Sequence, residues 1–427
     1  MSDTTSYEET LFEALTDDTD DPGGLSEAAQ ADEPGNFLRH ATSLSMTKLA
    51  DGLLSPKLVL SWLLNTLGAS SFLVGLLVPI REAGALLPQL FTAPRIHAMA
   101  RRKWAWAGGS AVQGAACAGI VLAGLTLDGN AAGIVICLLL AVLALARSVC
   151  SVSYKDILGK TVGTSRRGSA TGLAASVASV GVIVFALILV LDLGPRFALV
   201  IGALSLAAAL WLIAGALFST LREQPTPQEP EGTSLGQISL LTEDRQLLLF
   251  IIVRGLLTAT ALAPPYLILL GAEAGQGGFD QLGALVLASS VASFLSSYVW
   301  GRMSDRSSRN VLRLSGVVAA LALGAALLLE MSGLAGQWWA MPAVLFVLMI
   351  AYHGVRQGRS TYLVDMAPGD KRASYTAVSN TVIGVVLLGS GLFGALASIW
   401  GAGTTLALFA VMSLAAVGVA GQLDEVE

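Results

Sequence analysis

The sequence predicts an all-α membrane protein, with twelve transmembrane helices arranged as two pseudo-symmetric six-helix bundles. Three observations predict this fold class. The chain of 427 residues is 54% apolar and only 13% charged, with a mean hydropathy of +0.70, whereas soluble domains carry about 25% charged residues. It contains eleven clear apolar stretches of membrane-crossing length. A segment of the first half also recurs in the second half, 205 residues further on.

Residues 1–38 form an acidic tail, which we expect to be disordered and cytoplasmic. Residues 1–35 contain eleven acidic side chains and no Lys or Arg, and such one-sided charge is typical of disordered segments. The tail lacks the cationic start and apolar core of a signal peptide, so we expect no cleavage. Without residues 1–35 the formal charge of −5 becomes +6, so the rest of the chain is mildly basic.

Hydropathy alone identifies eleven spans, because a bilayer-crossing helix needs about 20 mostly apolar residues. Turn-forming sequences separate them, for example Asp128-Gly129-Asn130 and Leu193-Gly194-Pro195. The predicted spans are 69–93, 104–127, 131–152, 168–192, 197–220, 246–271, 281–300, 311–332, 338–363, 374–398 and 402–422.

The internal repeat adds a twelfth span. Residues 166–171 align with residues 371–376, and both segments open a helix rich in Gly and Val. Shifting the span that starts near residue 246 back by 205 predicts a helix that starts near residue 41. Residues 41–68 are amphipathic there, with Lys48, Asp51 and Lys57 among apolar side chains. The chain therefore divides into bundles 39–221 and 246–423, joined by a polar cytoplasmic linker, 222–245.

Loop charge predicts the orientation. With twelve spans, one side of the membrane receives a single predicted loop cation, Arg196, and the positive-inside rule places the other, basic side in the cytoplasm together with both termini. We expect this membrane to be the cell inner (plasma) membrane. The cytoplasmic loop cations are Arg95, Arg101, Arg102, Lys103, Arg166, Arg167, Arg222, Arg245, Arg302, Arg306, Arg309, Arg313, Lys371 and Arg372.

The loop after the eighth span reads GRMSDRSSRN, residues 301–310. It resembles the signature loop of the major facilitator superfamily, G-x-x-x-D-R/K-x-G-R/K-R/K. Gly301, Asp305, Arg306 and Arg309 match, whereas a serine and an asparagine replace the second glycine and the last basic residue. The equivalent loop of the first half, residues 93–103, keeps its basic end but has no acid and no leading glycine.

The resemblance covers about residues 40–423 and implies the superfamily's fold and a transport function. We expect Gly301, Asp305, Arg306 and Arg309 to form a cytoplasmic gating motif. In this hypothesis Asp305 lies near the positive amino end of the fifth span, around residues 165–169. The alternative, a set of positive-inside anchoring charges, explains the arginines but leaves Gly301 and Asp305 without a role.

Charged residues inside the first half need a reason, since each costs at least about 2.5 kcal/mol on insertion scales. Arg81 and Glu82 lie near the midplane of the second span and point about 100° apart, so each needs a partner on another helix. Lys48 and Asp51, three residues apart on the first span, are candidates. We interpret these four residues as a cluster that faces a central cavity, in which Glu82 or Asp51 carries a coupling proton. The alternative is a dry, structural network of ion pairs.

Further cations lie on the fourth, seventh and tenth spans: Arg147, Arg254, His353, Arg356 and Arg359. If they converge on the central cavity they suit an anionic group, because arginine presents a planar fork to carboxylate or phosphate. The alternative for Arg356 and Arg359 is an ion-paired cytoplasmic helix end. Pro264-Pro265 should kink or break the seventh span, as often occurs next to transporter substrate sites.

The leading hypothesis is a secondary transporter that moves a small polar or anionic solute by alternating access, coupled to protons. The sequence has no phosphate-binding loop, zinc-spaced His/Cys set or nucleophile elbow, so we expect no enzyme activity, cofactor, metal or nucleic-acid partner. We expect a monomer in the lipid bilayer, with a small molecule and a proton as its ligands. The alternative is a non-transporting membrane assembly factor or sensor on the same scaffold.

Overall fold

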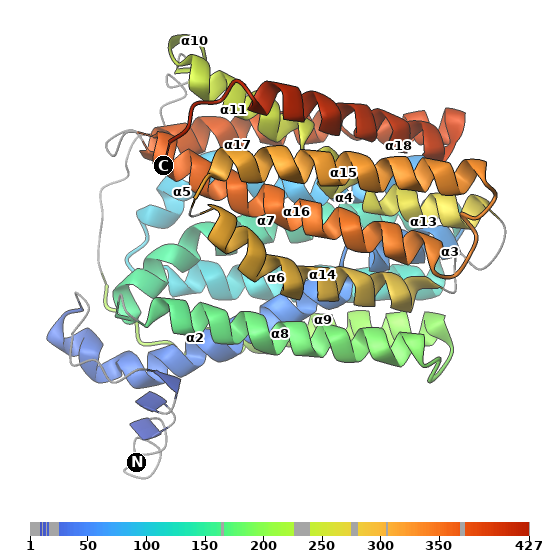
Figure 1. Ribbon diagram of the computed structural model, residues 1–427. Coiled ribbons are helices and arrows are strands. Elements are labelled where there is room, and N and C mark those ends of the chain that lie inside the picture. The colour runs from blue at the N-terminus through green and yellow to red at the C-terminus, as the bar shows by residue number, and fades with distance from the viewer. Residues whose placement is uncertain are drawn as a thin grey trace.

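The computed structural model describes residues 9–426 except 11, 14, 17–24, 164–165, 226–239, 275–280, 305 and 368–371. Within these ranges the regular elements are helices, and no strand occurs (Figure 1). Both marked termini lie at the left of Figure 1, which we call the termini end; the other is called the opposite end. Most of the predicted linker 222–245 lies outside the described residues.

Between residues 27 and 219, the described part of the chain forms eight helices. They are α2 (Glu27–Leu54), α3 (Val59–Thr66), α4 (Ser71–Leu86), α5 (Gln89–His97), α6 (Lys103–Thr126), α7 (Gly129–Thr161), α8 (Arg167–Val190) and α9 (Arg196–Ser219). The first two membrane crossings are each made of two pieces, α2 with α3 and α4 with α5. The predicted amphipathic first span is therefore present, interrupted at residues 55–58.

The carboxyl-terminal half supplies the other six crossings. Its helices are α10 (Leu240–Glu243), α11 (Arg245–Leu256), α12 (Ala259–Leu262), α13 (Pro264–Glu273), α14 (Leu282–Ser304), α15 (Ser308–Met331), α16 (Ala340–Met366), α17 (Arg372–Gly389) and α18 (Leu392–Ala420). The seventh crossing joins α11, α12 and α13. Gly401 has a positive φ of 83° and divides α18, so that its first part continues α17 and its second part is the twelfth crossing. This is the predicted twelve-helix architecture.

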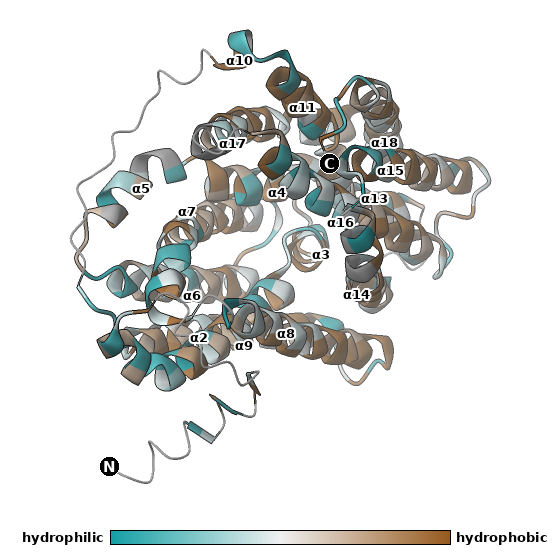
Figure 2. Ribbon diagram, turned by 60° about the vertical axis from the view of Figure 1, so that its left-hand side comes forward, coloured by the Kyte–Doolittle hydropathy of each residue, from teal (hydrophilic) through white to brown (hydrophobic). Residues whose placement is uncertain are grey.

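The helix shafts present a lipid-facing surface. Large apolar side chains such as Leu138, Val180 and Leu321 are more than half exposed, and Figure 2 shows hydrophobic shafts with hydrophilic residues gathered at helix ends. Exposed tryptophans mark both rims, with Trp104 at the termini end and Trp338 at the opposite end, as expected where aromatic rings sit at headgroup level. Eight described segments have the length and composition to cross a membrane without reference to the repeat.

The prediction that residues 1–38 are disordered is wrong for the last part of this segment, because α2 begins at Glu27. The buried Glu33 carboxylate accepts hydrogen bonds from the Gly163 backbone at 2.8 Å and from Arg166 at 2.9 Å. The Asn36 side-chain amide donates to the Arg222 carbonyl oxygen and accepts from the Arg222 backbone N–H. Acidic and polar side chains of this segment thus satisfy cations and backbone groups at the termini end of the first bundle, which composition alone does not reveal.

Two crossings are broken at repeat-equivalent positions. Ser55 lies outside the helical region, with φ 21°, and Pro56 follows it between α2 and α3. Shifted by the repeat offset, Ser55 corresponds to Thr260 in α12, within the interrupted seventh crossing. The expected break at Pro264-Pro265 is confirmed, since Pro264 begins α13. A proline removes a backbone donor and clashes with the preceding turn, so each break has a local cause.

Glycines bring the two bundles together at the opposite end. A Cβ added to Gly75 of α4 would lie 2.6 Å from the Gly394 Cα, and one added to Gly394 of α18 would lie 2.7 Å from the Phe72 carbonyl oxygen. A Cβ on Gly283 of α14 would lie 2.7 Å from the Val190 nitrogen at the end of α8. These approaches leave no room for a side chain, so the structure is closed at the opposite end.

We expect Gly394→Val to open that end. The valine side chain collides with the backbone of α4, which cannot move aside as a flexible side chain can. Spin labels on Leu193→Cys and Gln337→Cys, after replacement of the three native cysteines, should show a longer distance between the bundles by pulsed electron resonance. Gly324→Val is the matched control, because a Cβ there meets nothing within 4 Å. An unchanged distance in Gly394→Val would contradict the assignment.

Candidate functional site

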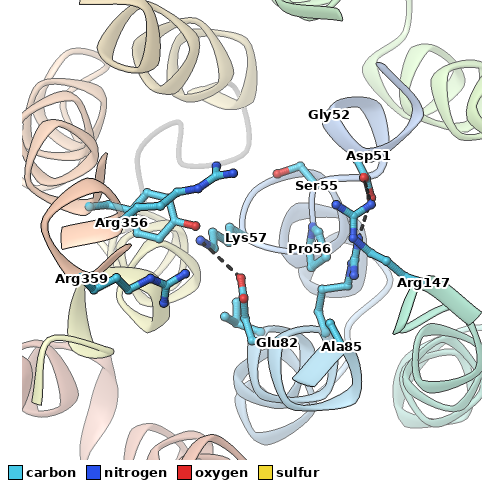
Figure 3. Close-up of a pocket in the computed structure, with 13 residues that line it drawn as sticks. Asp51, Gly52, Ser55, Pro56, Lys57, Glu82, Ala85, Arg147, Arg356 and Arg359 are labelled. Carbon is cyan, nitrogen blue, oxygen red and sulfur yellow. Dashed lines mark hydrogen bonds and ion pairs between the residues drawn. The ribbon is translucent and has the colours of Figure 1, made fainter. Parts of the chain in front are cut away.

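A polar cavity of about 400 Å³ lies between the two bundles, within the size range of small-molecule sites. It is lined by α2, α4, α7, α16 and the break after α2 (Figure 3). Five cationic and two acidic side chains face it, an excess of three positive charges. The cations are Lys57, Arg81, Arg147, Arg356 and Arg359, and the acids are Asp51 and Glu82.

Asp51 joins three helices of the first bundle. Arg81 of α4 donates to its Oδ1 atom at 2.6 Å, and Arg147 of α7 donates to its Oδ2 atom. Each carboxylate oxygen therefore accepts one guanidinium group, in the region at the right of Figure 3. The prediction that Arg81 finds its partner on the first span is confirmed. Because both arginines share one acid, this group retains one positive charge.

Glu82 has a different partner from the one expected. Its Oε1 atom lies 3.7 Å from Nζ of Lys57, at the break between α2 and α3. The same ammonium lies over the ring of Tyr352 on α16, 3.7 Å from its centroid, within the range of a cation–π contact. Lys57 thus links the acid of the first bundle to the aromatic ring of the second.

Sequence reasoning did not select Lys57 or Tyr352 as site residues. The sequence feature that could have identified Lys57 is its position directly after Pro56. This proline interrupts the helix near mid-membrane, so the side chain of the next residue leaves the regular helical pattern. Lys48, which the sequence offered as a partner, lies one turn before Asp51 on α2 and makes no hydrogen bond or ion pair within the described part of the chain.

Arg356 and Arg359 point into the cavity from α16 (Figure 3). Neither makes a hydrogen bond or ion pair with any described residue, so the alternative of an ion-paired helix end is not what the structure shows. The packing of α16 explains their direction. Gly354 and Gly358 lie against α14 and α15, and Arg356 is two residues, about 200°, from Gly354 around the helix. The arginine face is therefore turned away from the bundle and towards the cavity.

Arg254 lies beside this cavity, in a smaller one of about 60 Å³ that Glu82, Arg356 and Arg359 also line. Its side chain is buried and donates to Oγ of Ser379 at 2.7 Å and to Oδ1 of Asn380 at 2.9 Å, both on α17. These acceptors are neutral oxygens, so they fix the guanidinium group without cancelling its charge. Three arginines of the second bundle are thus gathered around the cavity without a carboxylate of their own.

Two other predicted groups are placed differently. His353 lines neither of these cavities and packs edge-on against Tyr352, with a ring-centroid distance of 5.3 Å. In the gating motif, Gly301 lies in α14, Arg306 is exposed, and Arg309 pairs with Glu425 at 2.6 Å beyond the end of α18. Asp305 and Ser165 lie outside the described residues, so a latch between Asp305 and the start of α8 stays a prediction.

The arrangement defines a class of protein: a polytopic helical membrane protein whose two bundles enclose a cation-lined cavity. Residues 257–423 match the family model of the Major Facilitator Superfamily. This match covers most of the second bundle, and the twelve-helix fold is compatible with the architecture of that family. No curated protein sequence matches the chain.

Solved structures resemble the whole chain in fold. A nucleoside transporter, NupG, superimposes with a TM-score of 0.70 at 14% identity, covering 91% of this chain and 100% of that one. A D-xylose-proton symporter gives 0.69 at 12% identity, over 92% and 98% of the two chains. A POT family transporter in complex with a thioalcohol-conjugated peptide gives 0.65 at 12% identity, over 90% and 94%. At these identities the likeness concerns the fold.

Proposed function

We propose that this protein is a secondary transporter that carries a small anionic solute through the central cavity by alternating access. The observation that carries the proposal is the excess of three positive charges around the cavity. An uncompensated cation inside a membrane is unfavourable. The two guanidinium groups of Arg356 and Arg359 suit carboxylate or phosphate oxygens. A bound anion would supply the missing negative charge.

The two-bundle construction and its glycine-lined closure at the opposite end support alternating access. We propose that the termini end is cytoplasmic, because the basic loops lie there. The cavity is then closed towards the outside in the structure described. Rocking of the bundles would separate Gly75 from Gly394 and expose the same charges to the other side. We further propose that a proton gradient drives the cycle, with Asp51 and Glu82 as the candidate proton carriers.

Solute flux in proteoliposomes tests the proposal. Under an imposed proton gradient, the panel contains phosphate, sulfate, succinate, lactate and glucose-6-phosphate, with neutral xylose and uridine as controls. We expect at least one anion to accumulate inside the vesicles, and neither neutral solute to do so. Transport of only the neutral solutes would contradict the charge argument. Absence of flux for the whole panel would instead favour the non-transporting assembly factor or sensor.

A further inference from the structure

A salt bridge at the edge of the cavity suggests how proton and anion are coupled. Lys57 is the cation that sits between the bundles, and Glu82 is its carboxylate partner at 3.7 Å. Figure 3 shows Lys57 between Glu82 on one side and the arginines of α16 on the other. An anion held by Arg356 and Arg359 would therefore reach the same ammonium group that Glu82 now holds.

We propose that Glu82 and the transported anion compete for Lys57, and that protonation of Glu82 hands Lys57 over to the anion. This inference rests on the proposed function and deepens it, since it names the proton site and the residue that couples it to the solute. A proton taken from water in the open cavity binds the Glu82 carboxylate and forms a neutral acid. Lys57 keeps its own charge and gains freedom to contact the anion. The proton returns to water after the anion has left.

The charges around Glu82 favour it over Asp51 for this role. Asp51 is occupied at both oxygens by Arg81 and Arg147, so a proton there would have to displace a guanidinium group. Glu82 has one ion pair, which is longer, and its side chain is 35% exposed against 20% for Asp51. Glu82 also lines both the main cavity and the smaller one beside Arg254. It is thus the more accessible of the two acids.

The groups that face Glu82 are nearly all cationic. They come from α4 itself and from four neighbouring parts of the chain: Arg81, Lys57, Arg147, Arg254, Arg356 and Arg359, with the Tyr352 hydroxyphenyl ring beside Lys57. Among the other helices packed on α4, three have no ionisable residue: α3, α12 and α18. On α17, the Tyr375 hydroxyl donates to Asp244 at 2.6 Å. On α13, Tyr266 lies at Gly75, two turns from Glu82, and Glu273 lies at Gly401. Glu82 is therefore the acid whose protonation is coupled to anion binding in this proposal.

Reciprocity between the two ligands gives the expected direction. If protonation of Glu82 strengthens anion binding, anion binding must strengthen proton binding by the same factor. A carrier with this property moves the two ligands together in one direction. Anion affinity should then fall as pH rises and Glu82 becomes ionised, because the carboxylate recaptures Lys57.

Anion binding to the purified full chain tests this inference, with sulfate and lactate as the two probes, because their charge is constant across the pH range used, and with thermal unfolding in detergent as the readout. We expect the wild-type affinity for at least one probe to fall between pH 5.5 and pH 8.5. Glu82→Gln should bind that probe with the same affinity at both pH values, and on the order of tenfold more tightly than wild type at the higher pH. Lys57→Met should bind weakly at both.

Two further results complete the test. In proteoliposomes, Glu82→Gln should exchange anion for anion but should not accumulate it under a proton gradient. Glu330→Gln, which removes an exposed carboxylate at the opposite end of α15, is the matched control and should keep the wild-type pH dependence. If Glu82→Gln keeps that dependence as well, the coupling assigned to Glu82 is wrong while anion transport stands. If neither probe binds to wild type at either pH, both the coupling and the anionic substrate are contradicted.

Discussion

Replacing Arg356 and Arg359 together with glutamine is expected to lower anion uptake by at least about 100-fold. A hydrogen bond to a charged group contributes roughly 1.5–3 kcal/mol, which corresponds to about a tenfold change or more for each arginine. Neither side chain supports the fold through an ion pair with a described residue, so the double variant should still fold. The initial rate of uptake into proteoliposomes at low substrate concentration measures the effect.

Single variants separate charge from geometry. Arg356→Lys and Arg359→Lys keep the positive charge but lose the planar fork, so uptake should fall less than with glutamine. The matched control is Arg196→Gln, since Arg196 pairs with Asp192 at the opposite end and lies outside the cavity. Wild-type uptake in the Arg356→Gln, Arg359→Gln double variant would show that the anion binds elsewhere.

Hydropathy and the internal repeat predicted the fold well, because each acts over whole segments. The lipid-facing shafts must be apolar whatever their partners, so eleven spans were evident. The first span was found only through the repeat, since Lys48, Asp51 and Lys57 interrupt its apolar run. The twelve crossings of the structure agree with these predictions. The start of α2 at Glu27 could not be predicted from hydropathy or the repeat. The polar side chains of this segment form hydrogen bonds with residues more than a hundred positions away in the sequence.

The sequence predicted most of the charged residues of the candidate site, but it did not predict all of the ion pairs between them. Sequence spacing showed that Arg81 and Glu82 need partners on other helices and offered Asp51, which was correct for Arg81. It could not show that Ser55 and Pro56 break the helix and bring Lys57 to Glu82, since that depends on the path of the chain through the break. The direction of Arg356 and Arg359 depends on the packing of Gly354 and Gly358 against the neighbouring helices, which one sequence does not display.

The carboxylate shared by two arginines gives the second large effect. Asp51→Asn removes the negative charge between Arg81 and Arg147, and breaking a buried pair by removing one partner costs about 3 kcal/mol. Arg81 carries most of this penalty, since its side chain is 12% exposed, whereas that of Arg147 is 39% exposed and can be hydrated. We therefore expect Asp51→Asn to lower the thermal unfolding temperature in detergent clearly, even without any solute.

A second substitution distinguishes charge imbalance from a lost contact. Adding Arg81→Met to Asp51→Asn removes the stranded cation and keeps apolar packing, so the double variant should recover most of the lost stability, because replacing both members of a buried pair by apolar groups is often neutral. Arg147→Met added to Asp51→Asn should recover less. Equal stability of all three variants would mean that water, rather than Asp51, balances these arginines. Recovery confined to Arg81→Met would show that Asp51 holds α2 and α4 together by neutralising a buried cation.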